Sequence, residues 1–125
     1  MEAQRLPGGP AFARVFEEGI SRAGRLLVLH ARPGLHEPAR VGFAVGKRLG
    51  GAVVRNRIRR RMRQAFRDLE GCATGADLVF VARGRIVDAS LPSIRREMRI
   101  LLAGLSGARC AGEGFPGIDV ESEGL

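Results

Sequence analysis

The sequence contains no tryptophan and no tyrosine, and its six aromatic residues are all phenylalanine. Stacking on a planar ligand must therefore use Phe, His or Arg side chains. The two cysteines, Cys72 and Cys110, lack the spacing of metal ligands, and we expect free thiols rather than a disulfide. The longest apolar runs, such as 26–29, are too short to cross a bilayer, and the N-terminus has no signal-peptide core. We therefore expect a cytoplasmic protein.

The residue sets that protein catalysis needs are missing as well. No Ser/His/Asp or Cys/His set stands out, and Glu17 and Glu18 are neighbours that would point apart on a helix. His30 and His36 have no metal-type partners, and we expect His30 to lie in a strand or a cleft. Segment 42–48 has three residues rather than four between its glycines, and an arginine where a P-loop has Ser or Thr. The sequence therefore predicts neither a catalytic residue nor a metal site.

Positive charge is what the sequence has in excess. The 21 Lys and Arg against 13 Asp and Glu give a net charge of +8, and residues 39–67 hold ten of the basic residues and no acid. This balance indicates a polyanionic partner, either nucleic acid or an anionic membrane surface. Residues 111–125 are glycine-rich and carry four acids without a base. We expect one folded domain over 1–110, because 45% of the chain is hydrophobic, and a disordered acidic tail over 111–125.

Periodicity and turn residues predict six main elements. In chain order they are a helix over 10–18, strands near 25–32 and 40–47, a long helix over 53–69, a strand over 77–83 and a helix over 91–105. Pro10 suits the first turn of the first helix, Gly19 its C-terminal stop with Ile20 as the apolar residue beyond, and Ser90 the N-cap of the last helix. The order α-β-β-α-β-α, with room for one extra short strand, predicts an α+β sandwich with a mixed sheet.

Two of these elements have faces that bear on function. The strand near 40–47 alternates bulky residues with glycine and alanine, so its small face would leave room for something to lie against the sheet. In the first helix, Phe12, Val15 and Phe16 share one face. The two phenylalanines fit plain core packing, and they also fit a cleft that exposes one edge of each ring. The sequence leaves both interpretations open.

The long helix carries seven arginines and no acid before Asp68. On a helical wheel the apolar residues form one core-facing stripe, made of Ile58, Met62, Ala65, Phe66 and Leu69. The opposite side holds Asn56, Arg60, Arg63 and Arg67, and the flanks hold Arg57, Arg59 and Arg61. A solvated helix usually mixes the two signs of charge, whereas these like charges repel unless a polyanion neutralises them. The planar arginine fork suits phosphate oxygens and stacking, so we favour an RNA-binding helix over a merely solvated one.

The motifs around this helix resemble those of bacterial ribonuclease P proteins. Residues 53–66, VVRNRIRRRMRQAF, resemble the RNR signature of that family. Residues 41–50, VGFAVGKRLG, resemble its strand and VSKK-(I/L)-G turn, with Gly46 and Arg48 where serine and lysine are usual. Residues 12–19 resemble its F-x-x-V-F first helix, and the resemblance extends over 5–105 in unbroken order. The N-terminal segment 5–9, RLPGG, departs from the usual basic RLKK, which puts contacts from that arm in doubt.

The resemblance implies an α/β sandwich with a left-handed βαβ crossover and a role as the accessory protein subunit of ribonuclease P. In this family a catalytic RNA removes the 5′ leader of precursor tRNA with Mg²⁺, and the protein binds no cofactor of its own. We expect a monomer in a 1:1 complex with the RNA. The resemblance assigns RNA contacts to Lys47, Arg48, Arg55, Asn56, Arg57, Arg59, Arg60, Arg63 and Arg67, and the leader cleft between the first helix and the sheet to Phe12, Phe16 and Phe43. The alternative is a structural RNA-binding protein of ribosomal type, and the RNRIRR helix after the VGKRLGG turn favours ribonuclease P.

Overall fold

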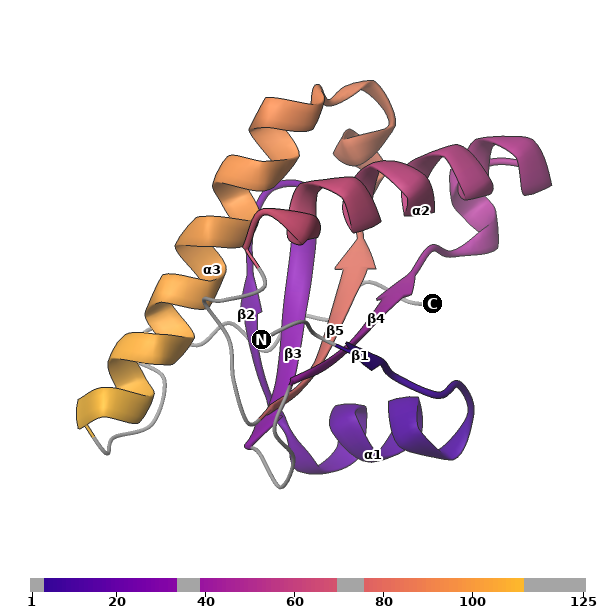
Figure 1. Cartoon of the computed structure of the whole chain (residues 1–125). Helices are drawn as coiled ribbons and strands as arrows, with labels where there is room; N and C mark the ends of the chain where they lie inside the picture. Colours follow the sequence, from indigo (N-terminus) through magenta and orange to yellow (C-terminus); the bar gives the residue numbers. More distant parts are fainter. Residues whose placement is uncertain (1–3, 34–38, 70–75, 112–125) are drawn as a thin grey trace.

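The computed structural model describes residues 4–33, 39–69 and 76–111, and it has the predicted α+β architecture (Figure 1). Three helices flank a mixed sheet. In chain order the elements are β1 (Gln4–Arg5), α1 (Pro10–Glu18), β2 (Ile20–Ala23), β3 (Leu27–Pro33), β4 (Arg40–Ala44), the 3-10 turn η1 (Lys47–Leu49), α2 (Ala52–Arg67), β5 (Ala76–Ala82), the 3-10 turn η3 (Gly84–Asp88) and α3 (Leu91–Ala111).

The sheet has the strand order β1-β4-β5-β3-β2. β4 and β5 are parallel neighbours and α2 connects them, which is the βαβ unit that the resemblance implies. β1 pairs parallel with β4, whereas β3 pairs antiparallel with both β5 and β2. β5 is buried along its whole length, as its continuous apolar run predicts for a central strand covered on both faces.

The sequence prediction was wrong at several element boundaries. It allowed one extra short strand, and the structure has two, β1 and β2. Gly19 ends α1 as predicted, but its φ of −89° and ψ of −176° are extended rather than left-handed and lead straight into β2. Glycine is needed there because a Cβ would lie 2.5 Å from the carbonyl oxygens of Val15 and Ala31. β4 ends at Ala44, α3 continues to Ala111, and the predicted tail beyond that residue lies outside the described residues.

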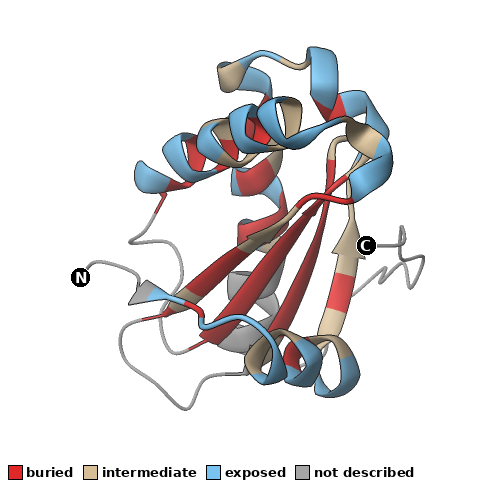
Figure 2. Cartoon of the chain, turned by 90° about the vertical axis from the view of Figure 1, so that its right-hand side faces the viewer, coloured by how far each residue is buried: buried red, intermediate tan, exposed pale blue. Residues whose placement is uncertain are grey.

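The helices cover the two faces of the sheet unequally (Figures 1 and 2). α2 and α3 pack on one face, where the predicted α2 stripe is buried in full, and Ile94, Met98 and Leu102 of α3 join it. α1 packs on the other face with Val15, above Val28 and Val79. Figure 2 shows buried strands between helices whose outer sides are exposed. Because α1 is short, it covers only part of this second face.

Two buried or half-buried carboxylates, neither of them predicted from the sequence, hold the elements together. The Glu97 carboxylate of α3 accepts hydrogen bonds from the backbone N–H groups of Arg25 (3.0 Å), Leu26 (2.7 Å) and Leu27 (2.8 Å). Buried Asp77 of β5 accepts two hydrogen bonds from the Arg40 guanidinium of β4, at 2.9 and 2.8 Å. That bidentate contact raises the pKa of Arg40 above its usual value. The first contact fixes α3 to the β2–β3 turn, and the second locks the start of β4 against β5.

Candidate nucleic-acid interface

α2 presents its arginines in an environment that leaves most of them exposed. The helix begins after Gly51 without a side-chain cap and has no acid in its first turn. Arg55 Nε donates to the Gly50 carbonyl oxygen at 3.1 Å, and Arg61 Nη1 donates to the Ala89 carbonyl oxygen at 3.2 Å. Arg55 is a predicted RNA contact, and Arg61 lies on the flank of the helix. Both therefore also hold the ends of neighbouring segments in place. The other five arginines of α2 bond to no backbone group among the described residues.

The turn before α2 adds two further cations. Lys47 and Arg48 are exposed in η1, as their predicted RNA contacts require. Gly50 ends this turn with a φ of +142°, a conformation that side-chain-bearing residues rarely adopt. Leu49, which lies between these two cations and α2 in the sequence, packs against the core. This contact holds Lys47 and Arg48 beside the N-terminal end of α2. Asn56, one turn into the helix, accepts a hydrogen bond from Arg59 Nη1 at 3.0 Å.

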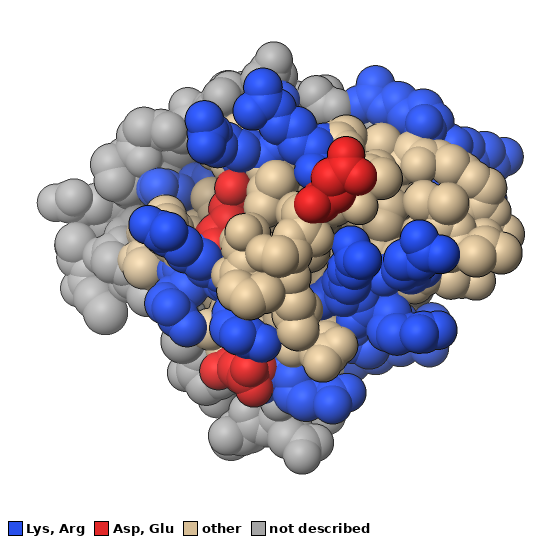
Figure 3. All heavy atoms as spheres, turned by 90° about the horizontal axis from the view of Figure 1, so that it is seen from above, with Lys and Arg blue, Asp and Glu red and all other residues tan. Residues whose placement is uncertain are grey.

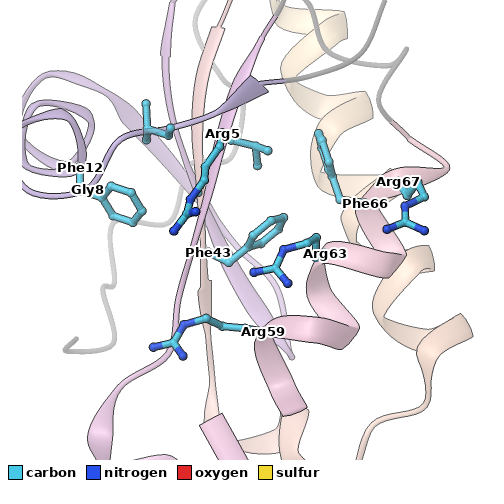
Figure 4. A pocket seen from close by; sticks show the side chains of 11 residues that line it. Arg5, Gly8, Phe12, Phe43, Arg59, Arg63, Phe66 and Arg67 are labelled. Atoms are coloured by element: carbon cyan, nitrogen blue, oxygen red, sulfur yellow. The ribbon is translucent and has the colours of Figure 1, made fainter. Parts of the chain in front are cut away.

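A cavity of about 470 Å³ lies where α1, β4 and α2 meet (Figure 4). Its residues come from the N-terminal segment, α1, β4 and α2, namely Arg5, Leu6, Gly8, Phe12, Val41, Gly42, Phe43, Arg59, Arg63, Phe66 and Arg67. Figure 4 shows Phe12 on the α1 side, Phe43 near the middle, and Arg59 and Arg63 on the α2 side. The cavity therefore combines aromatic rings with four guanidinium groups and contains no acidic side chain.

Gly42 allows Phe12 to reach the sheet. A Cβ at Gly42 would overlap the Phe12 ring, whose Cζ would lie 2.3 Å away. The small face of β4 was predicted to leave room for something to lie on it, and at this position the occupant is Phe12 of the same chain. Phe12 stays half-buried and lines the cavity, so it serves the core and the cavity together.

Phe16 lies elsewhere, although the sequence placed it with Phe12. Its ring packs edge-on against His30 of β3, with ring centroids 4.7 Å apart, and it does not line the cavity. Its ring centroid is 6.5 Å from that of Phe12. His30 is 9% exposed, and burial lowers the pKa of its imidazole. The structure thus favours core packing for Phe16, whereas Phe43 lines the cavity and stacks on Phe80, with ring centroids 6.0 Å apart.

The arginines of α2 divide into two groups that the helical wheel did not separate. Arg59, Arg63 and Arg67 line the cavity, although the wheel placed the last two with Arg60 on the side opposite the core. Because β4 lies at one side of α2, part of the helix surface that is polar on the wheel faces the cavity instead of open solvent. Arg57 and Arg60 are exposed and do not line the cavity.

Arg5 is a functional candidate that sequence analysis missed. It lies in β1, is exposed, and lines the cavity, although its segment lacks the usual basic pattern. Its position depends on the pairing of β1 with β4, where the Leu6 N–H donates to the Val41 carbonyl oxygen at 2.8 Å. A two-residue strand leaves no periodic pattern in a sequence, so only the basic side chain itself could have drawn attention to it.

The surface above α2 is strongly basic. Seen from above, Lys and Arg side chains surround this face, with a few acidic side chains between them (Figure 3). Within the described ranges no helix is long and apolar enough to cross a membrane. The described residues also bring no three His, Cys, Asp or Glu side chains together as metal ligands. The fold and the site together define a small α/β protein whose basic helix and aromatic cavity are suited to binding nucleic acid.

Comparison with known proteins identifies the family. The Ribonuclease P family model matches residues 1–106. The ribonuclease P protein component of Roseiflexus castenholzii is 42% identical over 102 residues, which cover 80% of this chain and 84% of that protein. That of Thermoanaerobacter sp. strain X514 is 40% identical over 93 residues, covering 73% and 79%. This chain belongs to the ribonuclease P protein family, whose members are subunits of the ribonucleoprotein that matures tRNA 5′ ends.

Solved structures agree with this assignment. The RNase P protein of Staphylococcus aureus is 28% identical, with a TM-score of 0.73 over 82% of this chain and 94% of that chain. The RNase P protein from Thermotoga maritima is 25% identical, with a TM-score of 0.73 over 80% and 96%. The family assignment excludes the alternative of a ribosomal-type protein, and in bacterial members the RNA carries out the catalysis.

Proposed function

We propose that α2 serves two RNAs from two sides. Its outward side, with Arg57 and Arg60 beside Lys47 and Arg48, binds the catalytic RNA of ribonuclease P. Its other side faces the cavity, which receives the single-stranded 5′ leader of precursor tRNA. The observation that carries this proposal is the cavity, because it places aromatic rings and three arginines of α2 around one space.

The chemistry of the cavity fits an unpaired RNA strand. Phe12 and Phe43 offer rings to a base, while Arg59, Arg63 and Arg67 offer forked donors to phosphate oxygens. Only an unpaired strand can present base faces to such rings, since bases of a duplex remain stacked on each other. A volume of about 470 Å³ suits a ligand of nucleotide size rather than a helix.

The protein adds binding and not bond cleavage under this proposal. Its cations lower the repulsion between the leader and the catalytic RNA, and Mg²⁺ acts within the RNA-containing holoenzyme. We further propose that one protein molecule joins one RNA in the cytoplasm. The Phe16 ring contributes to the leader cleft only by supporting α1, because it packs against His30.

The test compares Phe12→Leu with Phe16→Leu in the reconstituted holoenzyme. The two residues lie one turn apart on α1, and only Phe12 lines the cavity. Stacking on a base is worth about 1–3 kcal/mol, so Phe12→Leu should weaken binding of precursor tRNA about fivefold or more. Binding of mature tRNA, which has no leader, should not change, and Phe16→Leu should affect precursor binding less.

Equal losses for precursor and mature tRNA in a folded Phe12→Leu protein would refute the leader proposal. Melting curves of both variants check that the protein is folded. Protein freed of all RNA serves as the control for the chemistry, and it should not cleave the precursor.

A further inference from the structure

The outer side of α3 carries positive charge that is not balanced by any described acid. Over residues 91–104 the helix has three arginines, Arg95, Arg96 and Arg99, and a single acid, Glu97. The Glu97 carboxylate is occupied by three backbone N–H groups of the β2–β3 turn, and Arg95 pairs with Asp68 of α2. Arg96 and Arg99 are exposed, and neither side chain forms a hydrogen bond or an ion pair with another described residue. Their charges are therefore available to an external anion.

These two arginines share one side of the helix with an exposed apolar residue. Arg96 and Arg99 are three residues apart, so their Cβ atoms lie about 5–6 Å from each other. The opposite side of the helix is buried through Ile94 and Leu101. Ile100 follows Arg96 by about one helical turn and is 55% exposed. We call Arg96, Arg99 and Ile100 the α3 patch. Two forked donors beside an apolar side chain suit a sugar–phosphate backbone, whose phosphate oxygens accept hydrogen bonds and whose ribose carbons pack on Ile100.

The positive charge is distributed unequally between the two faces of the sheet. On the face that α1 covers, Arg14 and Glu17 of α1 are both exposed and carry opposite charges, and Glu18 pairs with Arg32 of β3 at 2.9 Å. α1 is thus balanced, whereas α2 and α3 on the other face expose arginines in excess. Segregation of one charge sign to one face is typical of a surface that binds a polyanion.

The contacts between α2 and α3 place the α3 patch away from the cavity. Arg95 Nε lies 3.2 Å from Asp68 Oδ2, and Arg61 Nη1 donates to the carbonyl oxygen of Ala89, two residues before α3 begins. Arg61 and Asp68 are seven residues apart and so lie on the same side of α2. Neither of them lines the cavity, whose arginines lie on another side of that helix. An RNA bound to the α3 patch is therefore not the strand that occupies the cavity.

We propose that the α3 patch binds phosphates of the catalytic RNA and forms a contact area separate from the outward side of α2. Phosphate contacts fix the position of a protein on a nucleic acid. Contacts from two helices that are joined to each other restrict rotation of the protein on the RNA more than contacts from α2 alone. The cavity then keeps one orientation relative to the catalytic RNA. The proposal rests on the proposed function in taking the catalytic RNA as the partner.

The first test measures binding of the full chain to the catalytic RNA alone, at several salt concentrations. Arg96→Gln and Arg99→Gln should each weaken binding and lower the slope of log affinity against log salt by about 0.7–0.9, because each removes one phosphate contact. Arg14→Gln is the matched control, since it removes the same charge from exposed α1 and should leave the slope unchanged. If all three variants have the same slope as the original chain, the α3 patch does not bind the RNA and the proposal is overturned.

The second test uses two opposite substitutions at one position. At low salt Ile100→Glu should weaken binding of the catalytic RNA about 2- to 5-fold, and Ile100→Lys should strengthen it by a similar factor, as expected for one exposed charge pair. A merely structural role of Ile100 would move both variants in the same direction. Melting curves check that both are folded. Equal losses in the two variants, or unchanged affinity in both, would contradict the proposal.

The failure of this proposal can be distinguished from that of the proposed function. If Arg60→Ala weakens binding of the catalytic RNA and the α3 variants do not, the α3 patch is refuted and the role of α2 stands. If only the α3 variants weaken it, the outward side of α2 is refuted and the α3 patch stands. In the reconstituted holoenzyme the α3 variants should leave the ratio of precursor to mature tRNA affinity unchanged. A changed ratio would assign the patch to the leader and overturn the proposal.

Discussion

Substitution of Glu97 tests how this fold is held together, because this one side chain bridges α3 and the β2–β3 turn. Its Oε2 accepts from Leu26 and Leu27, and its Oε1 accepts from Arg25. These partners lie 70 to 72 residues away in sequence. The close approach also requires Gly24, where a Cβ would overlap the carboxylate. The contact is therefore long-range and charge-assisted, and it leaves no room for a side chain at position 24.

The expected loss of stability follows from the backbone N–H donors that a glutamine at position 97 cannot satisfy. If the Glu97→Gln amide oxygen takes the place of Oε2, the bonds to Leu26 and Leu27 survive without their charge assistance. The amide NH₂ group then faces the N–H of Arg25, donor against donor. A hydrogen bond to a charged group contributes about 1.5–3 kcal/mol and a neutral one about 1 kcal/mol. We expect Glu97→Gln to lower the free energy of unfolding by about 2 kcal/mol and Glu97→Ala by about 3 kcal/mol or more.

Thermal and urea unfolding measure this loss directly. For a domain of this size about 2 kcal/mol corresponds to a fall in Tm of roughly 8–10 °C. Glu17→Gln is the matched control, because Glu17 is exposed on α1 and its loss should stay within about 0.5 kcal/mol. If Glu97→Gln and Glu17→Gln unfold at the same midpoint, the carboxylate clamp does not contribute to stability and the reasoning fails.

Two further predictions concern RNA and pH. Arg60→Ala should weaken binding of the catalytic RNA and lower its salt slope by about 0.7–0.9, whereas Arg63→Ala should act mainly on the precursor leader, as filter binding at several salt concentrations would show. Equal effects of both on both RNAs would contradict two separate sides of α2. Burial lowers the pKa of His30 below its usual 6.5, so the unfolded chain binds a proton first and stability falls as the pH drops below about 6.5. In His30→Gln the midpoint of urea unfolding should change less between pH 7 and pH 5 than in the original chain. If the pH dependence of the midpoint is the same in both proteins, His30 does not contribute to it.

The sequence was sufficient where one physical signal dominated a whole element. α2 was predicted because its apolar stripe repeats at helical spacing while every other side is basic, and the stripe is buried as expected. β5 was predicted from a continuous apolar run, which only a central strand can bury on both faces. Ser90 was predicted as an N-cap, and its Oγ accepts from the Ser93 N–H at 3.3 Å. Each of these signals is local and lies within a few residues.

The sequence failed where a contact joins distant residues. No local pattern could pair Glu97 with a turn some 70 residues earlier, or Asp77 with Arg40. The wheel of α2 could separate buried from polar sides, but it could not show which polar residues face β4. Phe12 and Phe16 share a helix face, yet one meets a glycine on β4 and the other an imidazole on β3. Their different roles are set by the partner strand and not by their spacing.

The cavity itself depends on a feature too small to predict, the brevity of β1. This strand pairs only with Arg40 and Val41, and the last bond of the pairing is the Leu6 N–H to the Val41 carbonyl. Among the described residues no strand pairs with the outer edge of β4 beyond that point. Because it stops there, Phe43 of β4, Phe12 of α1 and the arginines of α2 surround one space, and it is beside this open strand edge that we propose the single-stranded leader lies.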